Sequence, residues 1–598
     1  MSTPQDRPRS SAGQVKLTRG HSCVACHQRK VKCDGKRPCS TCVKSSRAAD
    51  CRSARPSSSR QSAVTDQTLL LRLRRYEHLL IANGIPLNGQ PGEEEGTPSR
   101  DTMETDGDDG HMIIQRGHPR FVENVIWNRL GNELAEDLSE LNEAGEAELS
   151  EDEDAVTPDN LIFGKPTMNN MSHLAPGVPQ ILRLWQAFLD NFNPLVKLFH
   201  APTIQQVISD AVADPQRLNP STEALLFSIY LCGATTLTNQ ECLTQLGESK
   251  PDLLRRFSAA TQQSLVNAQF LKSTDVVVLQ ALTLYLLARR SYMNEQSIWL
   301  LAGLASRLAQ TMGLHREHSL QRISPFEAEI RRRLWWQIVI LDNRSAQVSG
   351  TMADGIFNDS GYTRRPLNVS DSDLSPFMGE LPSEYDGPTE MLFCTIRFEV
   401  GEVMRQLTAV EKACKSNHAS CMAQKEQVID AFETKIEYLL KRCDPSIPLH
   451  LMSMLLGRSA VCQTRLSIWQ TKYDNTKNIP QAERDGMFRL ALKSLEYDSL
   501  TYSTKSLQPY LWHVVNNFPF QAFIHLLTDL FHRTHPEEIS LAWTAINQAY
   551  EDHPELISDV HSPLCFAVGN LTLKAWEHQA AAPSPQSPRG ERRLLALR

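Results

Sequence analysis

The stretch CVACHQRKVKCDGKRPCSTCVKSSRAADC, residues 23–51, holds six of the fourteen cysteines of this 598-residue chain. Their spacing is C-x2-C-x6-C-x5-C-x2-C-x8-C, which is two CxxC pairs that are each followed by one further cysteine. A short turn brings the sulfurs of a CxxC pair to one side, where tetrahedral Zn(II) is the usual ion. Almost no apolar side chains lie between the cysteines, so we expect metal binding to supply most of the folding free energy of this segment.

The number of sulfurs favours a shared site over two separate ones. Two tetrahedral ions need about eight ligand positions, so with six sulfurs two must bridge both ions, and the prediction is a binuclear cluster with two Zn(II) per chain. A four-cysteine ribbon would leave the repeat unexplained. A disulfide framework conflicts with an N-terminus that has no apolar secretory core, and a redox CxxC would be expected in a βαβ context. The predicted ligands are Cys23, Cys26, Cys33, Cys39, Cys42 and Cys51.

Positive charge is concentrated around the same cysteines. The first 60 residues carry fourteen Lys and Arg against three acids, although the whole chain has a net charge of -7. Offsetting the negative charge of a two-zinc, six-thiolate cluster would use only part of this excess. A local basic patch on an acidic chain indicates a polyanionic partner, and nucleic acid is the usual one.

The segment after a Ser- and Arg-rich linker has the pattern of a short coiled coil. Within residues 66–84, apolar side chains recur at alternating steps of four and three residues, the a/d spacing of a heptad repeat: Leu69, Leu73, Tyr76 and Leu80. We expect this helix to mediate dimerisation. The alternative is an amphipathic helix that packs on the rest of the protein, since helices this short are marginal alone.

Acidic residues dominate the next part of the chain. We expect residues 85–175 to be largely disordered, apart from an ordered-looking island at 118–130. Residues 131–154 contain eleven acids and no base, and their leucines lie near one face of a nascent helix. This composition suits a transcriptional activation segment that folds on a coactivator, or alternatively a solvated acidic linker.

Beyond this segment the pattern is almost entirely helical. The sequence Ser324-Pro325-Phe326-Glu327 predicts a helix start, with Ser324 as the cap and Glu327 reaching back to complete a capping box. A stripe of apolar residues behind it predicts a core-facing side: Phe326, Ile330, Leu334, Ile338 and Leu341. The run Val276–Ala288 is too short for a membrane span of about twenty residues and is predicted to be a buried helix.

The helical region carries no recognisable catalytic motif. It has no GxGxxG, P-loop, GxSxG or HExxH, and its histidines do not cluster at ligand spacing, so we do not expect an enzyme. We interpret the adjacent arginines Arg331, Arg332 and Arg333 as a solvated helix face. We interpret Trp335 and Trp336 as core residues. A small-molecule pocket is compatible with this region, but the sequence does not locate one.

These residues carry a resemblance to a known family. The cysteine spacing, the basic run HQRKVKC and the segment DGKRPC are similar to those of the fungal zinc binuclear cluster transcription factors. The short coil and a helical region containing SPFEAEIRRRLWWQIVILDNRSAQVSG resemble the rest of that family's layout, including its fungal-specific regulatory domain. The resemblance implies that Cys23 and Cys39 are the two bridging ligands.

The resemblance also implies how the cluster reads DNA. Basic residues after the second cysteine, which match Arg29 and Lys30, would enter the major groove and read a CGG-type triplet. Lys32 and Arg37 would contact phosphates. This agrees with the general preference of Lys and Arg for guanine O6 and N7. His27 departs from the Arg or Lys usual at its position, which predicts a weaker or pH-dependent contact there.

The fold class predicted is a small zinc-cluster domain and a short coil, followed by a large all-α regulatory domain with disordered linkers. The predicted function is that of a nuclear, sequence-specific transcription factor, an activator, that binds double-stranded DNA as a homodimer and has no membrane segment. Family members of this layout often control biosynthetic gene clusters or nutrient pathways. The alternative is a scaffold whose zinc module binds protein or RNA.

The predicted organisation is a disordered basic lead at 1–20, the zinc cluster at 21–54, a linker at 55–65, the coil at 66–84, the acidic segment at 85–175, the helical domain at 176–577 and a disordered tail at 578–598.

Overall fold

The computed structural model divides into two compact units, Met1–Met103 and Glu104–Arg598, which are described separately. The described residues are 26, 30, 31, 33, 38–45, 51, 111–115, 118–122, 124, 126, 127, 130, 159–167, 171–351, 363–414, 418–473, 479–559 and 562–581. The predicted basic lead, linker, coiled coil and acidic run 131–154 lie outside these residues. In the first unit the structure describes one helix, α2 (Ser40–Lys44), which belongs to the cysteine cluster.

The first half of the helical body is built around α9 (Pro220–Thr236). Thirteen of its seventeen residues are buried, as expected for a helix that is apolar on all sides. Gly233 allows α6 to approach closely, because a Cβ at this position would lie 2.5 Å from the carbonyl oxygen of Leu184. The surrounding elements are α6 (Val178–Ala187), η3 (Phe188–Phe192), α7 (Asn193–Val196), α8 (Ala201–Ala213), α10 (Asn239–Glu241), η5 (Cys242–Leu246), α11 (Lys250–Asn267), α12 (Val276–Arg289) and α13 (Glu295–Thr311).

The second half is a separate group of helices with its own large core, called the second core, and a smaller core formed by the first three of its long helices. Its long members are α16 (Leu392–Ala413), α17 (His418–Leu440), α18 (Pro448–Tyr473), α19 (Gln481–Ser503), α21 (Phe520–Leu530), α22 (Pro536–Asp552) and α24 (Pro563–Ala581). The short elements of the body are η4 (Pro215–Arg217), η6 (Arg290–Tyr292), α14 (Glu317–Leu320), η7 (Asp371–Asp373), η8 (Lys505–Tyr510), α20 (Leu511–Val514), η9 (Val515–Asn517) and α23 (Glu555–Ser558).

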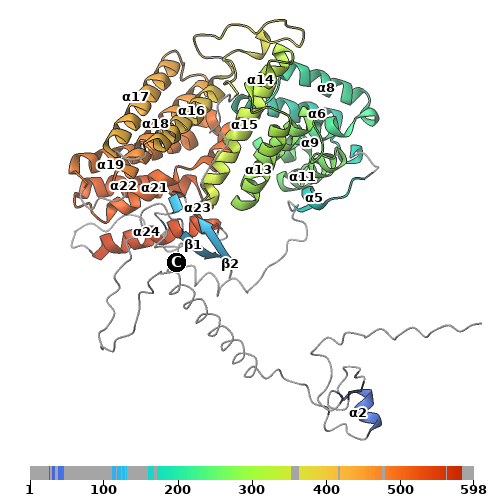
Figure 1. Cartoon of the computed structure of the whole chain (residues 1–598), viewed down its shortest axis with the longest axis horizontal. Coiled ribbons are helices and arrows are strands. Elements are labelled where there is room, and N and C mark those ends of the chain that lie inside the picture. The colour runs from blue at the N-terminus through green and yellow to red at the C-terminus, as the bar shows by residue number, and fades with distance from the viewer. Residues whose placement is uncertain are drawn as a thin grey trace, which may run out of the picture. The chain divides into compact units, whose positions relative to one another are not determined.

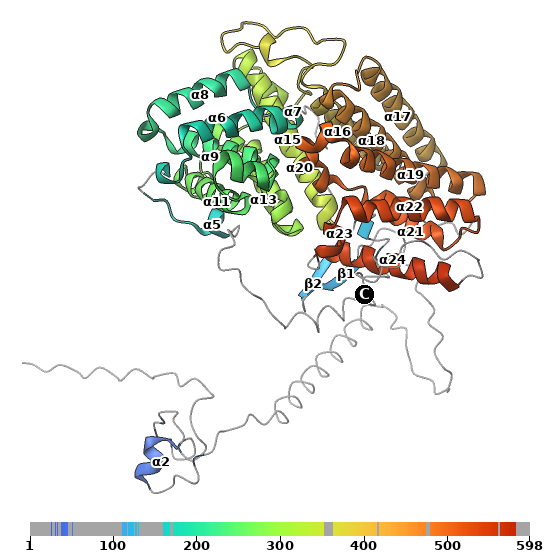
Figure 2. The same ribbon diagram turned by 180° about the vertical axis from the view of Figure 1, so that it is seen from behind.

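Helix α15 (Pro325–Ser349) runs between the two halves of the body. In Figure 1 the helices α6 to α13 lie on one side of it and α16 to α22 on the other, and Figure 2 shows the same division from behind. Its first part contributes Leu334 and Trp335 to the first core. Its last turn contacts the second core through Val348.

The predicted start and buried side of α15 are confirmed. Ser324 is the N-cap, and its side chain accepts a hydrogen bond from the backbone N–H of Glu327. Glu327 does not complete the capping box but pairs with Arg331 one turn later. The apolar stripe and both tryptophans are buried, with the exception of Phe326, which is half-buried.

The interpretation of the arginine triple as a solvated face is wrong for two of its members. Arg333 is completely buried and Arg332 is 4% exposed. Arg333 donates to Asp371 at 2.6 Å and Arg332 to Glu317 at 2.7 Å, and both also pair with Glu329. Carboxylates from neighbouring segments compensate these charges, which explains how a charged run can lie inside a protein.

A β-hairpin and a short helix join the body from the segment that we expected to be largely disordered. Strands β1 (His111–Gln115) and β2 (His118–Val122) pair antiparallel, with His111 opposite Val122. Val122, Trp127 and neighbouring apolar residues are buried in the second core, which accounts for the order expected at 118–130. The helix α5 (Asp159–Phe163) and the turn η2 (Ser172–Leu174) pack on the first core through Leu161 and Met171.

Helix α12 confirms the prediction for the most apolar run of the chain. Asp275 caps it by accepting from the N–H of Val277, and eleven of its fourteen residues are buried. No helix among the described residues has the length and apolar character needed to cross a membrane.

Candidate metal centre and nucleic-acid interface

Three cysteine sulfurs meet at the centre of the first unit. The Sγ atom of Cys26 lies 3.5 Å from that of Cys39 and 3.8 Å from that of Cys42. All three side chains are at most 2% exposed. A zinc ion with Zn–S bonds of about 2.3 Å has neighbouring sulfurs about 3.8 Å apart in a tetrahedron. The sulfurs are therefore spaced as thiolate ligands of zinc would be.

Helix α2 places two of these sulfurs. Cys39 is its N-cap, and the sulfur of Cys39 accepts a hydrogen bond of 3.4 Å from the backbone N–H of Cys42. Because Cys39 and Cys42 lie within the same first turn, both sulfurs point to one side of the helix. The second CxxC pair thus forms the chelating turn expected from its spacing.

Two further predicted ligands border this group. Cys51 lies beside it, since its sulfur accepts from the backbone N–H of Cys39 at 3.2 Å. Cys33 also packs against the buried cysteines and is half-buried. Five of the six predicted ligands thus come together, whereas Cys23 lies outside the described residues. Zinc bound to these thiolates would cross-link segments that have no apolar core of their own.

Lys30 occupies a turn on the surface of this cluster. Its φ of 50° is in the left-handed region, and the N–H of Val31 donates to the carbonyl oxygen of Cys26 at 3.1 Å. This bond, together with a left-handed residue, is the usual ending of a helix. The side chain of Lys30 is exposed, so it is available to a partner. The other predicted DNA contacts, Arg29, Lys32 and Arg37, lie outside the described residues.

The described part of the chain has no second group of candidate metal ligands. There, the cysteine cluster is the one place where three or more His, Cys, Asp or Glu side chains bring their donor atoms within 4.8 Å of one another. The arrangement defines a class of protein: a cysteine-ligated zinc module with an exposed basic turn, joined to a large helical body.

Comparisons with known proteins agree with this class. Residues 21–61 match the fungal Zn(2)-Cys(6) binuclear cluster domain, and residues 185–377 match the fungal specific transcription factor domain. The first match includes all six cysteines of the cluster.

Similar proteins extend the match over nearly the whole chain. The aurofusarin cluster transcription factor aurR2 of Gibberella zeae is 37% identical over 574 residues, which covers 95% of this chain and 81% of that protein. The transcriptional regulator AacuB of Aspergillus aculeatus is 30% identical, and the match covers 98% of this chain and 87% of that protein. The pyriculol/pyriculariol biosynthesis cluster transcription factor 1 of Pyricularia oryzae is 31% identical, and the match covers 95% of this chain and 79% of that protein.

The chain belongs to the fungal zinc binuclear cluster transcription factors. It is a transcription factor and not an enzyme, and the predicted family and fold class are confirmed. Zinc as the ion of the cysteine cluster and DNA as the partner follow from membership in this family.

Proposed function

We propose that this protein is a nuclear activator that binds CGG-type triplets as a homodimer and regulates a biosynthetic gene cluster. Two of its relatives are named as transcription factors of such clusters, one for aurofusarin and one for pyriculol and pyriculariol. The proposal that this chain controls a comparable set of genes rests on those names and on similarity along nearly the full chain.

We assign the six cysteines to two zinc ions, with Cys23 and Cys39 as the bridging ligands. The position of Cys39 supports this assignment, because its sulfur is completely buried and contacts the sulfur of Cys26, while its N–H donates to Cys51. A bridging ligand has to lie between the two metals, and a central, enclosed sulfur suits that position.

The observation that carries base recognition is the exposed side chain of Lys30 on a turn tied to Cys26. The metal-bound cysteine would fix this turn, so that Lys30 and its neighbour Arg29 meet a base edge in the major groove. Lysine and arginine donate to guanine O6 and N7, which distinguishes guanine from the other bases. Lys32 and Arg37 would contact phosphates and set the register.

The test compares Lys30→Gly with Lys44→Ala in the full-length protein on DNA duplexes with intact or mutated CGG triplets. Glycine adopts the left-handed conformation of residue 30 freely, so the turn should survive. K30G should lose about 1–3 kcal/mol of discrimination between the two duplexes. Lys44 is also an exposed base, at the end of α2. K44A should weaken binding to both duplexes equally through the loss of a general phosphate attraction.

An equal loss on both duplexes for K30G would show that Lys30 contacts phosphate and not bases. Binding of RNA or of protein without any preference for the CGG duplex would instead support a zinc-module scaffold.

The activator role rests on the acidic composition of residues 131–154. Deletion of these residues should lower reporter transcription from a promoter with the bound triplets while leaving DNA affinity unchanged, because an activation segment contacts a coactivator and not DNA. Unchanged transcription after the deletion would contradict the assignment.

A further inference from the structure

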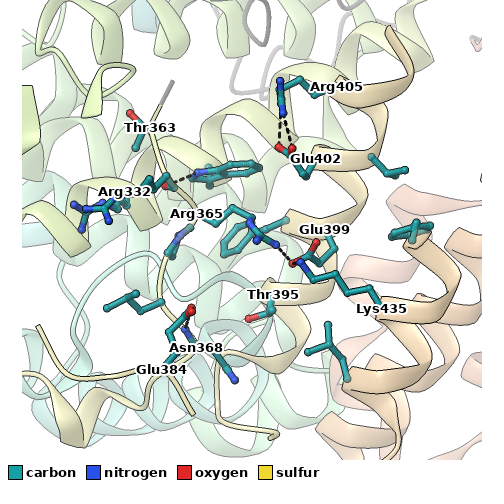
Figure 3. A pocket seen from close by; sticks show the side chains of 18 of the residues that line it. Arg332, Thr363, Arg365, Asn368, Glu384, Thr395, Glu399, Glu402, Arg405 and Lys435 are labelled. Carbon is teal, nitrogen blue, oxygen red and sulfur yellow. Dashed lines mark hydrogen bonds and ion pairs between the residues drawn. The ribbon is translucent and has the colours of Figure 1, made fainter. Parts of the chain in front are cut away.

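The helical body contains a cavity of about 860 Å³ at the junction of α15, α16 and α17. Two loop stretches, 363–368 and 381–385, complete its wall (Figure 3). Cavities of roughly 300–1,000 Å³ are the size that holds drug-sized ligands in proteins. The size alone identifies no ligand, but the chemistry of the wall does.

Aromatic side chains form a rigid part of this wall. The ring centroids of Trp336 and Phe398 lie 5.5 Å apart, and both side chains are nearly completely buried. The indole N–H of Trp336 donates to the carbonyl oxygen of Arg364 at 3.0 Å, which fixes the ring in place. Phe432 on α17 also lines the cavity. Both rings line the cavity, and the small part of each that the protein leaves uncovered offers an apolar contact to a flat aromatic ligand.

Two cations of the wall share one carboxylate. Arg365 and Lys435 both pair with the same oxygen of Glu399, and the Lys435 distance is 2.8 Å. The side chains of Arg365 and Lys435 are 38% and 43% exposed, whereas Glu399 is 6% exposed. Burial and then the charge of Arg365 lower the pKa of Lys435. Guanidinium and ammonium groups carry several donors each, so this pair retains donors for a second acid.

Each other arginine of the wall makes two contacts with carboxylates, whereas Arg365 and Lys435 share a single carboxylate oxygen. Arg405 forms two hydrogen bonds with Glu402, at 3.0 and 2.6 Å. Arg332 pairs with Glu317 at 2.7 Å. Arg365 and Lys435 are therefore the cations best placed to take an acidic group from a ligand.

Hydrogen-bonding groups lie on the remaining wall. Thr395 lines the cavity from α16, and its buried hydroxyl oxygen has no hydrogen-bond partner among the described residues. In Figure 3 this hydroxyl points towards the side of Asn368 and Glu384. Glu384 accepts from the backbone N–H of Asn368 at 3.1 Å, and a carboxylate can accept further bonds. A buried hydroxyl without a partner is unfavourable, and a hydrogen bond from a ligand hydroxyl would remove this penalty.

We propose that this cavity binds a small aromatic acid that carries hydroxyl groups. Its ring system packs against Trp336 and Phe398, and its acidic group binds Arg365 and Lys435. Its hydroxyl groups hydrogen bond with Thr395 and Glu384. The site belongs to the helical body, so the inference stands independently of which DNA sequence the zinc cluster reads.

The binding test uses 3-hydroxy-2-naphthoate as the probe, titrated into the full-length, zinc-loaded protein by calorimetry. Its methyl ester is the matched neutral ligand with the same ring and hydroxyl group. The acid should bind saturably at one site per chain. The ester should bind at least about fivefold more weakly, because it cannot form a charge-assisted contact with Arg365 and Lys435.

Four variants locate the site. Lys435→Met should weaken binding of the acid about fivefold, whereas Lys441→Met, an exposed lysine just beyond α17 that does not line the cavity, should leave binding unchanged. Glu399→Gln should strengthen binding about fivefold, since it removes the carboxylate that competes for the two cations. Ala431→Phe fills the cavity from an exposed position on α17 and should abolish binding without disturbing the core.

Three results would overturn the inference: no saturable binding of the acid, equal affinity for the acid and the ester, or binding that A431F leaves intact. Far-ultraviolet circular dichroism of every variant verifies that the helical body is folded. E399Q provides a gain of affinity, which a damaged protein could not produce.

Discussion

His553 illustrates how a single buried side chain sets a pH response. Its Nε2 atom lies 2.7 Å from Asp498 on α19, and its Nδ1 atom lies 2.8 Å from Glu555 on α23. The rings of Tyr502 and Phe518 cover it, with centroids 4.5 and 4.6 Å away. Burial alone would lower the pKa of His553, but the hydrogen bonds and charges of the two carboxylates outweigh it and raise that pKa to about 9. His553 is therefore a buried cation at neutral pH.

We expect the free energy of unfolding to fall as pH rises between about 6.5 and 9. The folded state holds a proton on His553 that the unfolded chain, with a pKa of about 6.5, releases earlier. The stabilisation is complete below pH 6.5 and is lost as the pH passes the folded pKa, a change of up to about 3 kcal/mol. Urea unfolding at several pH values should show that the stability difference between the wild type and His553→Gln shrinks as pH rises.

A difference that stays constant from pH 6 to 9 would contradict this assignment of the buried charge. The comparison with H553Q is needed because buried cysteines and tyrosines with raised pKa values also lower stability at the alkaline end.

The buried arginines show that the local sequence does not reveal whether a charged side chain is buried. Arg332 and Arg333 occupy a helix whose apolar stripe was predicted, and an adjacent charged run usually faces water. Their burial depends on Asp371 and Glu317, which lie 38 and 15 residues away in the sequence. Only the tertiary structure brings these carboxylates to the arginines. The burial of the arginines could therefore not be predicted from the local sequence.

At the scale of elements, the junction between α15 and the β-hairpin depends on one glycine. Gly350 ends α15 with a φ of +85°, and a Cβ there would lie 2.7 Å from a side-chain methyl group of Val122. Trp127 donates to the carbonyl oxygen of Val348 at 3.1 Å, and Asn124 donates to that of Gln347 at 2.8 Å. The end of the helix is thus the docking site for the segment after the hairpin.

Gly350→Ala and Gly247→Ala separate backbone strain from close packing. Both glycines have left-handed φ values at helix ends, but Gly247 has no atoms near its absent Cβ. G247A should cost only about 1–2 kcal/mol for the left-handed conformation. G350A should cost about 1–3 kcal/mol more, because the new methyl group overlaps Val122. Urea unfolding gives both values, and equal losses would show that the hairpin segment moves aside freely.

The helices were more predictable than the hairpin. Ser324 and Asp275 act through neighbours two or three residues away, so caps are visible in the sequence. Strands β1 and β2 have five residues each and depend on burial of Val122 and Trp127 against distant helices. A two-stranded hairpin is marginal alone, and its acidic, glycine-containing surroundings indicated disorder.

At the scale of the whole molecule, the two units are stabilised by different means. We expect the cysteine unit to rely on metal ligation, whereas the helical body has extensive apolar cores. Removal of zinc should therefore unfold the first and leave the second intact.

Treatment of the full-length protein with 1,10-phenanthroline should abolish binding to the CGG duplex. The helical circular dichroism signal and the thermal midpoint of the body should not change, because no metal contributes to the apolar cores. Added zinc should restore DNA binding. A fall in the midpoint of the body on chelation would mean that the helical body also depends on metal.

The same contrast explains why the sequence predicted the zinc cluster but did not locate the cavity. All six cysteines of the zinc cluster lie within 29 residues, so their spacing alone led to a proposed set of ligands. The cavity is lined from five separate stretches between Arg332 and Leu439, with ordinary residues at no recognisable spacing. Only the packing of α15, α16 and α17 brings these side chains together.

The position of α15 constrains how this protein can diverge from its relatives. The helix is about 37 Å long and belongs wholly to the 185–377 region that matches the family model, whereas the hairpin and α16 to α24 lie outside that region. A chimera that takes α15 from one parent and the second core from another would inherit a helix end shaped for a different partner. Recombination should therefore succeed only when Gly350 and the segment around Val122 and Trp127 are exchanged together.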